Sequence, residues 1–323
     1  MYKSKEATVS VIIPLYNKGK YVERTITSVL AQTYQPYEII VVDDGSTDDG
    51  PEKVLKLNNP RIILVRQDNR GPGAARNAGL AMAKGKYVSF LDADDEWYSS
   101  FLGKGISYLD NNRDVGAAIT GYHQYPSMRM NSEGLMKLQG IYEITPDTNI
   151  DLVRDIVTYS SLCFAVIRTA IARRWGGYFD RIKCTRGEDA HLFLKLLFNE
   201  KIAIIPEPHG LYHTEASDLC GRGYSTIPPL EPFLMDPYDI VTSCPPAKRH
   251  ILREFLSRKA LGSAVMYAKL GQKKIAKDLL DRFCSNGTLN ATQVLKGRIL
   301  ADCAPVLPSV RRVWSLAKSI AGK

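Results

Sequence analysis

Four short apolar runs alternate with helix-forming stretches over the first 91 residues. The runs, rich in β-branched residues, cover Thr8–Ile13, Glu38–Val42, Arg61–Arg66 and Tyr87–Leu91. The stretches between them, with helical spacing or helix-forming composition, are Tyr21–Tyr34, Ser46–Leu57 and Pro72–Ala83. We expect Pro14 to end the first run, because proline has no N–H for a β-ladder. This β-α-β-α-β-α-β order predicts a parallel sheet covered by helices, with right-handed crossovers.

The rest of the chain is less regular and predicts three parts. Further helices are expected over Ser100–Leu109, Asp147–Val157 and Ala190–Phe198, and further strands over Val115–Tyr122, Leu162–Ile167 and Lys201–Ile205. Eight prolines between Pro206 and Pro246 favour an extended connector. Helical patterns resume over Ala247–Leu270, Lys273–Phe283, Ala291–Ala301 and Ser309–Ile320. We therefore expect an α/β domain over residues 1–215, a connector over 216–246 and a basic helical extension over 247–323.

Composition narrows the class of protein. At 323 residues and 45% hydrophobic content, the chain resembles a globular protein, and its apolar runs are shorter than the roughly 20 residues of a membrane span. The short run near the N-terminus does not look like a signal peptide. Six cysteines occur without C-x-x-C pairs, which argues against a zinc knuckle or a disulfide framework and favours structural thiols in a reducing cytoplasm.

Charge is distributed unevenly along the chain. Residues 245–323 hold 16 Lys and Arg against four acidic residues, a net of +12. The preceding 244 residues hold 27 basic and 30 acidic residues, a net of −3. Such asymmetry indicates an anionic partner for the basic part, either a membrane surface or nucleic acid.

Carboxylates follow two of the predicted strands. Asp92, Asp94 and Asp95 come directly after the apolar run Tyr87–Leu91. Crowded like charges raise one another's pKa unless a cation or hydrogen-bond donors neutralise them, and Mg²⁺ and Mn²⁺ prefer oxygen ligands. One interpretation is a metal–diphosphate site, and the other is an acidic turn that caps the next helix. A second acidic pair, Asp43-Asp44, ends another strand at the edge where open α/β sheets bind ligands, which favours the first interpretation.

Other candidate residues have both a functional and a structural interpretation. Pro14-Leu15-Tyr16-Asn17 follows the first strand, where it can contact a base or simply form a turn. Asp44 can accept hydrogen bonds from a base or a ribose, or cap a helix. Arg76 lies about one turn inside a helix whose amino end favours anions, so it can reach a diphosphate or lie on the surface.

Glu188 and Asp189 begin a predicted helix. Thr185-x-x-Glu188 fits a capping box, and acidic residues in the first turn suit the helix dipole. Asp189 is then one acidic residue more than a cap needs, next to the glycine-containing loop Trp175–Thr185. A carboxylate that projects into a cleft there can act as a general base for a hydroxyl nucleophile. Both interpretations stay open on local grounds.

Taken together and in order, these motifs resemble a known family. The set consists of Pro14-x-Tyr16-Asn17, Asp43-Asp-Gly-Ser-Thr-Asp48, Gly71 with Ala75-Arg-Asn77, Asp92-Ala-Asp94-Asp95 and Gly187-Glu-Asp189. It resembles the inverting nucleotide-sugar glycosyltransferases of family 2, which have the GT-A fold. The resemblance covers about Val9–Ser217 and is specific for the family, but not for the sugar.

The resemblance implies a fold, a reaction and a donor site. The fold would be a Rossmann-like mixed sheet flanked by helices, with residues 1–215 as the catalytic domain and a helical extension after it. The reaction would transfer a sugar from a nucleotide-diphospho-sugar, a UDP-sugar by analogy, to a hydroxyl acceptor. On the donor side, Pro14, Tyr16 and Asp44 would line the uridine pocket, Arg76 would lie near the nucleotide, and Asp92 would lie by the ribose.

The resemblance also implies a metal and a base. Asp94 would be the main ligand of a divalent cation, Mn²⁺ or Mg²⁺, in the Asp-x-Asp motif, with Asp92 beside it directly or through water. Asp189 would be the catalytic base and Glu188 its neighbour. Many members carry Tyr-Arg-x-His after the last strand, whereas this chain has Tyr212-His213-Thr-Glu. His213 therefore has two interpretations, a metal or diphosphate ligand and an ordinary surface histidine.

The C-terminal part suggests where such an enzyme would work. Ser309–Ile320 places apolar residues, with Trp314, on one helical face and basic residues around it, which is typical of an interfacial membrane helix or of a helix packed on the body. The acceptor would be a glycan or a lipid-linked glycan. We expect a cytoplasmic protein, which would lie on the inner face of the membrane if Ser309–Ile320 is an interfacial helix.

Two other functions remain as alternatives. The first is a nucleotidyltransferase on a similar frame, although that class favours a glycine-rich basic loop where Pro14–Asn17 stands. The second is a non-catalytic binder of nucleotide-sugars or nucleic acid. We expect no nucleic-acid partner, because aromatic stacking motifs are not evident.

Overall fold

The structure, a computed structural model, describes residues 9–130, 134–184, 186–216 and 227–285. The chain forms two compact units, one of Met1–Ile144 with Asp155–Ser217 and the other of Thr145–Arg154 with Asp218–Lys323. The first unit contains the strands β1 (Val9–Leu15), β2 (Glu38–Asp43), β3 (Ile62–Arg66), β4 (Tyr87–Phe90), β5 (Glu96–Trp97), β6 (Val115–Tyr125), β7 (Arg129–Met130), β8 (Gly140–Tyr142), β9 (Ala165–Arg168) and β10 (Lys201–His213).

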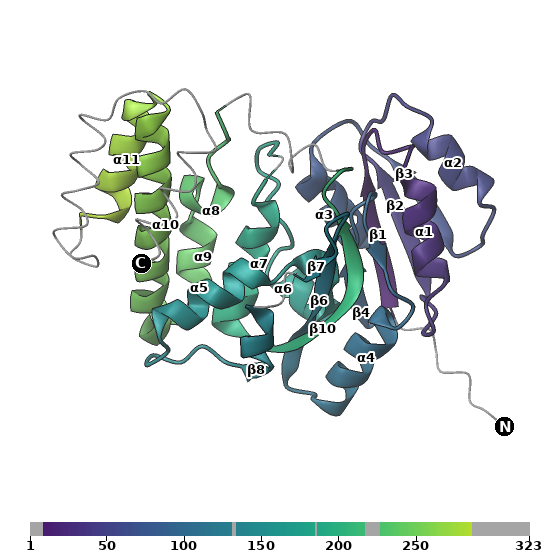
Figure 1. The fold of residues 1–323 in the computed structure, drawn as a ribbon, viewed down its shortest axis with the longest axis horizontal. Coiled ribbons are helices and arrows are strands. Elements are labelled where there is room, and N and C mark those ends of the chain that lie inside the picture. Colours follow the sequence, from purple (N-terminus) through teal and green to yellow (C-terminus); the bar gives the residue numbers. More distant parts are fainter. Residues whose placement is uncertain (1–8, 131–133, 185, 217–226, 286–323) are drawn as a thin grey trace. The chain divides into compact units, whose positions relative to one another are not determined.

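Helices precede and follow these strands in the first unit. They are α1 (Val22–Leu30), α2 (Gly50–Lys56), α3 (Pro72–Met82), α4 (Phe101–Asn111), α6 (Thr169–Arg174) and α7 (Glu188–Asn199), with 3₁₀ turns η2 (Leu135–Leu138) and η3 (Leu162–Phe164). One of the three boundaries between the two units falls within α5 (Ile150–Tyr159). The α/β alternation predicted for the first 91 residues is confirmed (Figure 1).

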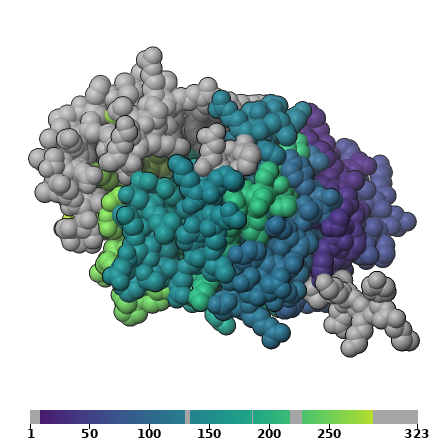
Figure 2. Space-filling model, turned by 60° about the horizontal axis from the view of Figure 1, so that its bottom comes forward, coloured from purple at the N-terminus to yellow at the C-terminus, as the bar shows by residue number. Residues whose placement is uncertain are grey.

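The strands form one mixed sheet in the order β3-β2-β1-β4-β9-β6-β10-β5. Strands β1 to β4 are mutually parallel, whereas β9 runs antiparallel to both β4 and β6. Strand β10 is parallel to β6 and antiparallel to the short β5. Figure 2 shows the corresponding surface, where green residues from the β10 region lie between the teal and the blue and purple segments of the first unit. The sheet therefore brings the chain after β4 next to the end of β10.

Strand β1 does not stop before Pro14, contrary to the sequence-based expectation. It continues to Leu15, and Pro14 is paired in register with Val42 of β2. In a parallel ladder, alternate residues bond to opposite neighbours, and Ile12 bonds on the β4 side by accepting from the N–H of Leu91. The backbone of Pro14 faces that same side, but pairing between β1 and β4 ends at Ile12 and Phe90. The missing N–H therefore removes no bond from the ladder.

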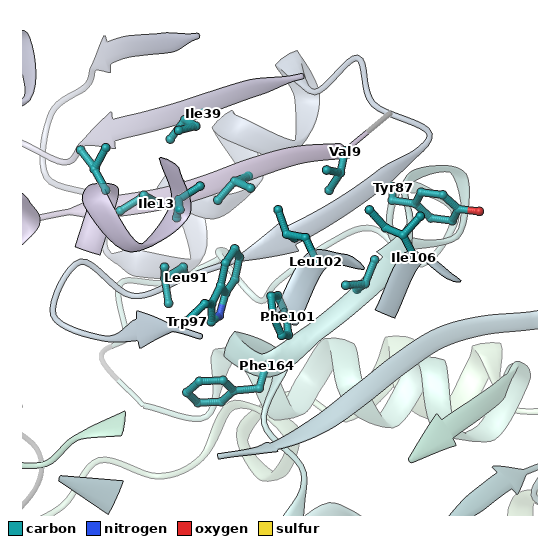
Figure 3. Packing of buried hydrophobic residues seen from close by; sticks show 14 of the residues in the cluster. Val9, Ile13, Ile39, Tyr87, Leu91, Trp97, Phe101, Leu102, Ile106 and Phe164 are labelled. Carbon is teal, nitrogen blue, oxygen red and sulfur yellow. The ribbon is translucent and has the colours of Figure 1, made fainter. Parts of the chain in front are cut away.

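The hydrophobic core of the first unit lies between the sheet and its helices. All six residues of β2 are buried, as expected for a parallel strand covered on both faces. Ile13, Ile39 and Leu91 belong to one buried cluster, in which Leu91 lies beside Trp97 (Figure 3). The ring of Trp97 contacts that of Phe101 at a centroid distance of 4.2 Å. This packing fixes both ends of the turn that holds Asp92, Asp94 and Asp95.

The described part of the second unit is helical. It contains α8 (Pro232–Met235), α9 (Tyr238–Ser243), η4 (Pro246–Lys248), α10 (Arg249–Lys269) and α11 (Lys273–Phe283). Two short helices therefore stand in the stretch expected to be extended, and Pro232 occupies the first turn of one of them, where a missing N–H costs nothing. Among the described residues, no helix combines the length and the apolar composition that crossing a bilayer requires. The predicted helices Ala291–Ala301 and Ser309–Ile320 lie outside the described residues.

Candidate active site

Acidic side chains meet where β4 ends and α7 begins. Asp92, Asp94 and Asp95 occupy the turn between β4 and β5, and Glu188 and Asp189 form the first turn of α7. The helix starts there because Gly187 adopts a left-handed conformation with a φ of 80°, which glycine accepts without strain. Thr185 of the proposed capping box lies outside the described residues. The fold thus gathers two of the predicted motifs that are about 95 positions apart in sequence.

Arg76 joins these two acidic groups. Its Nη2 donates to Asp92 Oδ1 at 2.5 Å and its Nη1 donates to Glu188 Oε1 at 2.8 Å. Arg76 and Glu188 are both buried, whereas the Asp92 side chain is 30% exposed. Burial lowers the pKa of Arg76, but the neighbouring Asp92 and Glu188 raise it well above its ordinary value. Arg76, which we expected to lie near the nucleotide, is therefore also the cation that holds the two acidic groups together.

The two acidic residues of α7 differ in their partners. Glu188 is paired with Arg76, whereas Asp189 Oδ1 accepts a hydrogen bond from the N–H of Ala190 at 2.8 Å. Burial raises the pKa of Asp189, and Arg76 offsets part of this increase. The pKa of Glu188 is also raised by burial, against the effect of Arg76. A carboxylate with a raised pKa and few donors is a stronger proton acceptor, as a general base requires.

Helix α3 fixes the loop that leads to α7. The Asn77 side chain accepts from the N–H of Tyr178 at 2.8 Å and donates to Tyr178 O at 2.8 Å and to Asp180 Oδ2 at 3.0 Å. The Tyr178 ring lies under the Arg76 guanidinium at 4.8 Å from its centroid, a cation–π contact. A Cβ on Gly73 would lie 2.1 Å from Phe179 O, so this glycine permits the close approach. The stretch Gly177–Asp180 is therefore held against α3.

Asp94 is already paired with a cation of the chain. Its Oδ2 lies 2.9 Å from Lys18 Nζ, and its backbone oxygen accepts from Arg24 Nη2 at 2.7 Å. Burial and the charge of Asp92 raise the pKa of Asp94, whereas Lys18 lowers it. Sequence reasoning missed Lys18, because the two residues are 76 positions apart and no local pattern links them.

His213 is held by acidic side chains on both of its ring nitrogens. Nε2 lies 2.7 Å from Glu96 Oε1 and Nδ1 lies 2.8 Å from Glu215 Oε1. Its backbone N–H donates to Asp95 Oδ1 at 2.8 Å, which fixes the end of β10 beside the acidic turn. His213 is buried, so it is not a surface histidine. It can bind a metal only if one glutamate releases its nitrogen.

The predicted donor residues lie at the ends of β1 and β2. Tyr16 is 46% exposed, as a residue that contacts a ligand can be. Asp44 is buried and accepts three hydrogen bonds, from Gln67 Nε2 and Arg70 N on Oδ1 and from Gly71 N on Oδ2. A carboxylate offers about four acceptor positions, so Oδ2 retains one. Asp44 thus fixes the loop before α3 and still has an acceptor to offer.

The acidic turn has the chemistry of a cation site. One ligand atom from each of Asp92, Asp95 and Cys163 lies within 4.8 Å of the others. Asp95 is 1% exposed, and its Oδ2 has no hydrogen-bond partner among the residues that the structure describes. Burial and the charges of Asp92 and Asp94 raise the pKa of Asp95 well above its ordinary value. A divalent cation or a proton would satisfy this oxygen, so the donor set fits a metal at the turn.

Comparison with known proteins points to one family. The sequence profile of glycosyl transferase family 2 matches residues 10–176. WfaP of Escherichia coli, named a UDP-Glc:alpha-D-GlcNAc-diphosphoundecaprenol beta-1,3-glucosyltransferase, is 30% identical over 190 residues, which are 58% of this chain and 70% of that protein. The chain spans 20% or less of three Rickettsia glycosyltransferases that it matches at 39 to 42% identity.

Two solved structures share the fold of this chain. Residues 1–349 of S. aureus TarS, in complex with UDP-GlcNAc, superimpose with a TM-score of 0.70 at 20% identity, over 97% of this chain and 92% of that one. The mannosyltransferase PcManGT from Pyrobaculum calidifontis, in complex with GDP-Man and Mn²⁺, gives a TM-score of 0.52 at 22% identity, over 98% of this chain and 86% of that one.

Proposed function

Because the chain belongs to glycosyl transferase family 2, we propose that it transfers a sugar from a UDP-sugar to a hydroxyl acceptor with inversion at the anomeric carbon. The likeness to TarS makes its fold GT-A, a mixed sheet flanked by helices. The family makes the chain a glycosyltransferase. The donor, the stereochemistry and the roles of single residues are our proposal.

One observation carries the proposal: the Arg76 bridge between Asp92 and Glu188. Asp92 follows β4, at the edge where open α/β sheets bind ligands. Glu188 precedes Asp189 on α7. A single buried guanidinium therefore keeps a donor-side carboxylate and the candidate base in one cluster. Such fixed geometry is what a displacement between two bound substrates requires.

Asp189 is proposed to take the proton of the acceptor hydroxyl. As the acceptor oxygen bonds to the anomeric carbon, the bond from that carbon to the nucleoside diphosphate breaks, and the O–H proton moves to the Asp189 carboxylate. A positioned base typically accelerates such a step 10²–10⁴-fold, about 3–5 kcal/mol. The raised pKa of Asp189 makes its carboxylate a better proton acceptor.

A divalent cation, Mn²⁺ or Mg²⁺, is proposed as the cofactor, held by Asp94 and Asp92. Bound there, it would stabilise the negative charge of the leaving diphosphate as a Lewis acid. Asp95 Oδ2, which has no hydrogen-bond partner in the described part of the chain, supports a cation at this turn. PcManGT was solved with Mn²⁺. We leave His213 out of this ligand set because both of its ring nitrogens contact glutamates.

The uridine is proposed to lie against Pro14, Tyr16 and Asp44. The remaining acceptor position on Asp44 Oδ2 suits the imide N–H of uracil. Tyr16 comes directly after β1 and is exposed, so its ring is available to a ligand. The name of WfaP and the TarS complex both contain a UDP-sugar, which supports this choice of nucleotide.

The acceptor is proposed to be a glycan, or a lipid-linked glycan, of the cell surface. WfaP is named for a diphosphoundecaprenol acceptor, and TuaG of Bacillus subtilis for teichuronic acid biosynthesis. A peripheral contact with the inner face of the membrane, through the basic helix predicted at Ser309–Ile320, would bring the chain to such an acceptor. That helix lies outside the described residues.

A panel of nucleotide-sugars, scored by release of the nucleoside diphosphate with and without Mn²⁺, tests this function. We expect release from a UDP-sugar that depends on the metal and increases with a matching acceptor. Asp94→Ala should abolish the effect of Mn²⁺ on UDP binding, and an unchanged titration would refute the metal site. Release of pyrophosphate from nucleoside triphosphates instead would identify a nucleotidyltransferase and refute the proposal.

A further inference from the structure

The ammonium group of Lys18 lies on the carboxylate proposed to bind the metal. Lys18 Nζ is 2.9 Å from Asp94 Oδ2 and 2.7 Å from the backbone oxygen of Ala216. Both side chains are mostly buried, with 19% of Lys18 and 13% of Asp94 exposed, so water screens their charges only in part. A monovalent cation of the chain therefore already neutralises Asp94.

The loop that carries Lys18 is built to hold it there. Asn17 has a left-handed φ of 51°, and its Oδ1 accepts from the N–H of Thr47 at 2.8 Å. The N–H of Gly19 donates to Asp48 Oδ2 at 2.7 Å, and Lys53 Nζ donates to Gly19 O at 2.9 Å. Lys18 is thus anchored on both sides, so little additional ordering is needed to bring its side chain to Asp94.

The same anchoring explains why α2 starts later than the sequence suggests. Ser46 and Thr47, which begin the predicted helix Ser46–Leu57, bond to other segments: Ser46 N–H donates to Asp43 Oδ1, and Thr47 N–H to Asn17 Oδ1. The helix then begins at Gly50. A Cβ on Gly19 would lie 2.4 Å from Asp49 Oδ1, so the loop packs tightly against the start of α2.

We propose that Lys18 is a built-in counter-ion that occupies Asp94 until the donor arrives and then moves to the donor diphosphate. This rests on the proposed function, because it requires Asp94 to bind a divalent cation. A metal on Asp94 would lie beside the ammonium group of Lys18, which is 2.9 Å from Oδ2, and the two positive charges repel, so Lys18 weakens metal binding in the absence of nucleotide. The diphosphate gives the released ammonium a new acceptor, so metal and nucleotide each favour the binding of the other.

Binding of Mn²⁺ with and without UDP tests this device directly. In the full chain, Lys18→Met should tighten Mn²⁺ alone about fivefold, the effect expected when a partly buried ion pair is removed. The factor by which UDP improves Mn²⁺ affinity should fall by a similar amount. Lys18→Arg should keep the wild-type pattern, because it retains a cation in the same place. Titration calorimetry measures all of these quantities without turnover.

Two controls separate the ion pair from other effects. Lys20→Met removes the same charge two residues away, where the side chain lies near the Tyr21 ring, and should leave both quantities unchanged. Asp94→Asn should weaken Mn²⁺ binding whether or not Lys18 is present. Mn²⁺ affinity that Lys18→Met leaves unchanged or weakens, or that Lys20→Met raises equally, would overturn the proposal.

The proposed function and this device fail in different ways. If no donor is turned over but the Mn²⁺ and UDP titrations behave as expected, the transfer reaction is refuted and the role of Lys18 stands. If UDP does not bind, or binds without improving Mn²⁺ affinity in the wild type, the movement of Lys18 to a diphosphate is refuted. If transfer occurs and Asp94→Asn binds Mn²⁺ like the wild type, the metal is elsewhere and Lys18 has no such role.

Discussion

Arg76 lies between two carboxylates in a largely dry part of the first unit, so its loss should be costly. Arg76→Met would leave Glu188 buried without its cation and Asp92 without its partner. Breaking one side of a buried ion pair typically destabilises by about 3–5 kcal/mol. Urea unfolding should report a loss of this size.

The matched control for Arg76 is an exposed arginine with two acidic partners. Arg66 has a side chain that is 59% exposed and pairs with Asp43 and Glu52. Arg66→Met should cost less than about 1 kcal/mol, because water screens such pairs. Equal losses of unfolding free energy in the two variants would show that the buried Arg76 bridge stabilises the fold no more than an exposed ion pair does.

Asp189 should make stability depend on pH. Burial raises its pKa, so the folded chain binds a proton more readily than the unfolded chain. This contribution to stability is fully present below the ordinary value of 3.8 and is lost as pH rises through the raised pKa. Asp189→Asn, which mimics the neutral form, should therefore stabilise the fold by about 1 kcal/mol at pH 7.

Urea unfolding at pH 7 and near pH 4 measures this difference. The gain from Asp189→Asn should be smaller at the lower pH, because the wild-type carboxyl takes up a proton as pH falls through its raised pKa. Asp147→Asn, at an exposed carboxylate, should change stability by less than about 0.5 kcal/mol at either pH. A variant of Asp189 that is less stable than the wild type at pH 7 would contradict a desolvated carboxylate there.

Local sequence patterns identify the acidic residues of the site but not the residues that pair with them. Asp92 and Asp189 could be identified because each lies at the boundary of a predicted element. Asp92 follows an apolar run, and Asp189 lies in the first turn of a predicted helix. Lys18 and Cys163 carry no such local signal, because their neighbours at the site come from distant segments. Arg76 was found, but its partner Glu188 is 112 positions away, and that pairing appears only in the fold.

At the scale of elements, α3 does more than cover the sheet. Its first turn packs on the loop before α7, with Gly73 at the point of closest approach to Phe179 O. Gly73→Ala would place a methyl group 2.1 Å from that oxygen, so helix or loop must shift. We expect a loss of about 1–3 kcal/mol, as for other overpacked sites, and a lower transfer rate.

Gly103 provides the control for Gly73. It lies within α4, and a Cβ there would come no closer than 3.5 Å to Thr33 Oγ1. Gly103→Ala should stabilise the chain by about 0.5–1 kcal/mol, because alanine has the higher helix propensity. If Gly73→Ala unfolds at the same urea concentration as the wild type, the close contact is not a constraint.

The elements that periodicity predicts best are the parallel strands. Strands β2, β3 and β4 match their apolar runs to within a residue. In β2 and β4, burial on both faces gives a continuous apolar signal, whereas β3 lies at the end of the strand order and is only partly buried. Strand β10 extends to His213, eight residues beyond the predicted end at Ile205. Its later part carries prolines and register shifts against β6, which hide a strand from propensity-based reasoning.

At the scale of the whole molecule, charge divides the chain into a near-neutral part and a strongly basic part. The last 79 residues hold a net charge of +12, and the predicted interfacial helix contributes Arg311, Arg312 and Lys318 to it. Each Lys or Arg near an anionic bilayer contributes about 1 kcal/mol. A chain ending after Ala304 should therefore bind vesicles with anionic lipid at least tenfold more weakly, as flotation would measure.

Vesicle composition is the control for this truncation. Neutral vesicles should bind the full chain weakly, and salt should reduce binding to anionic ones. If the full and truncated chains float equally with anionic vesicles, the basic C-terminal segment does not bind membranes. The α/β order of the first 91 residues predicted the fold class, but which surface the basic segment meets depends on a partner that no intramolecular pattern encodes.

The proposed reaction depends on Asp189 taking the proton of the acceptor. The most direct test compares the transfer rate and the UDP affinity of the wild type and Asp189→Asn, with Mn²⁺ and the best donor from the panel. We predict that the variant transfers at least 100-fold more slowly while UDP affinity changes less than about twofold, because only the transition state uses the base. Full activity in Asp189→Asn would contradict the claim.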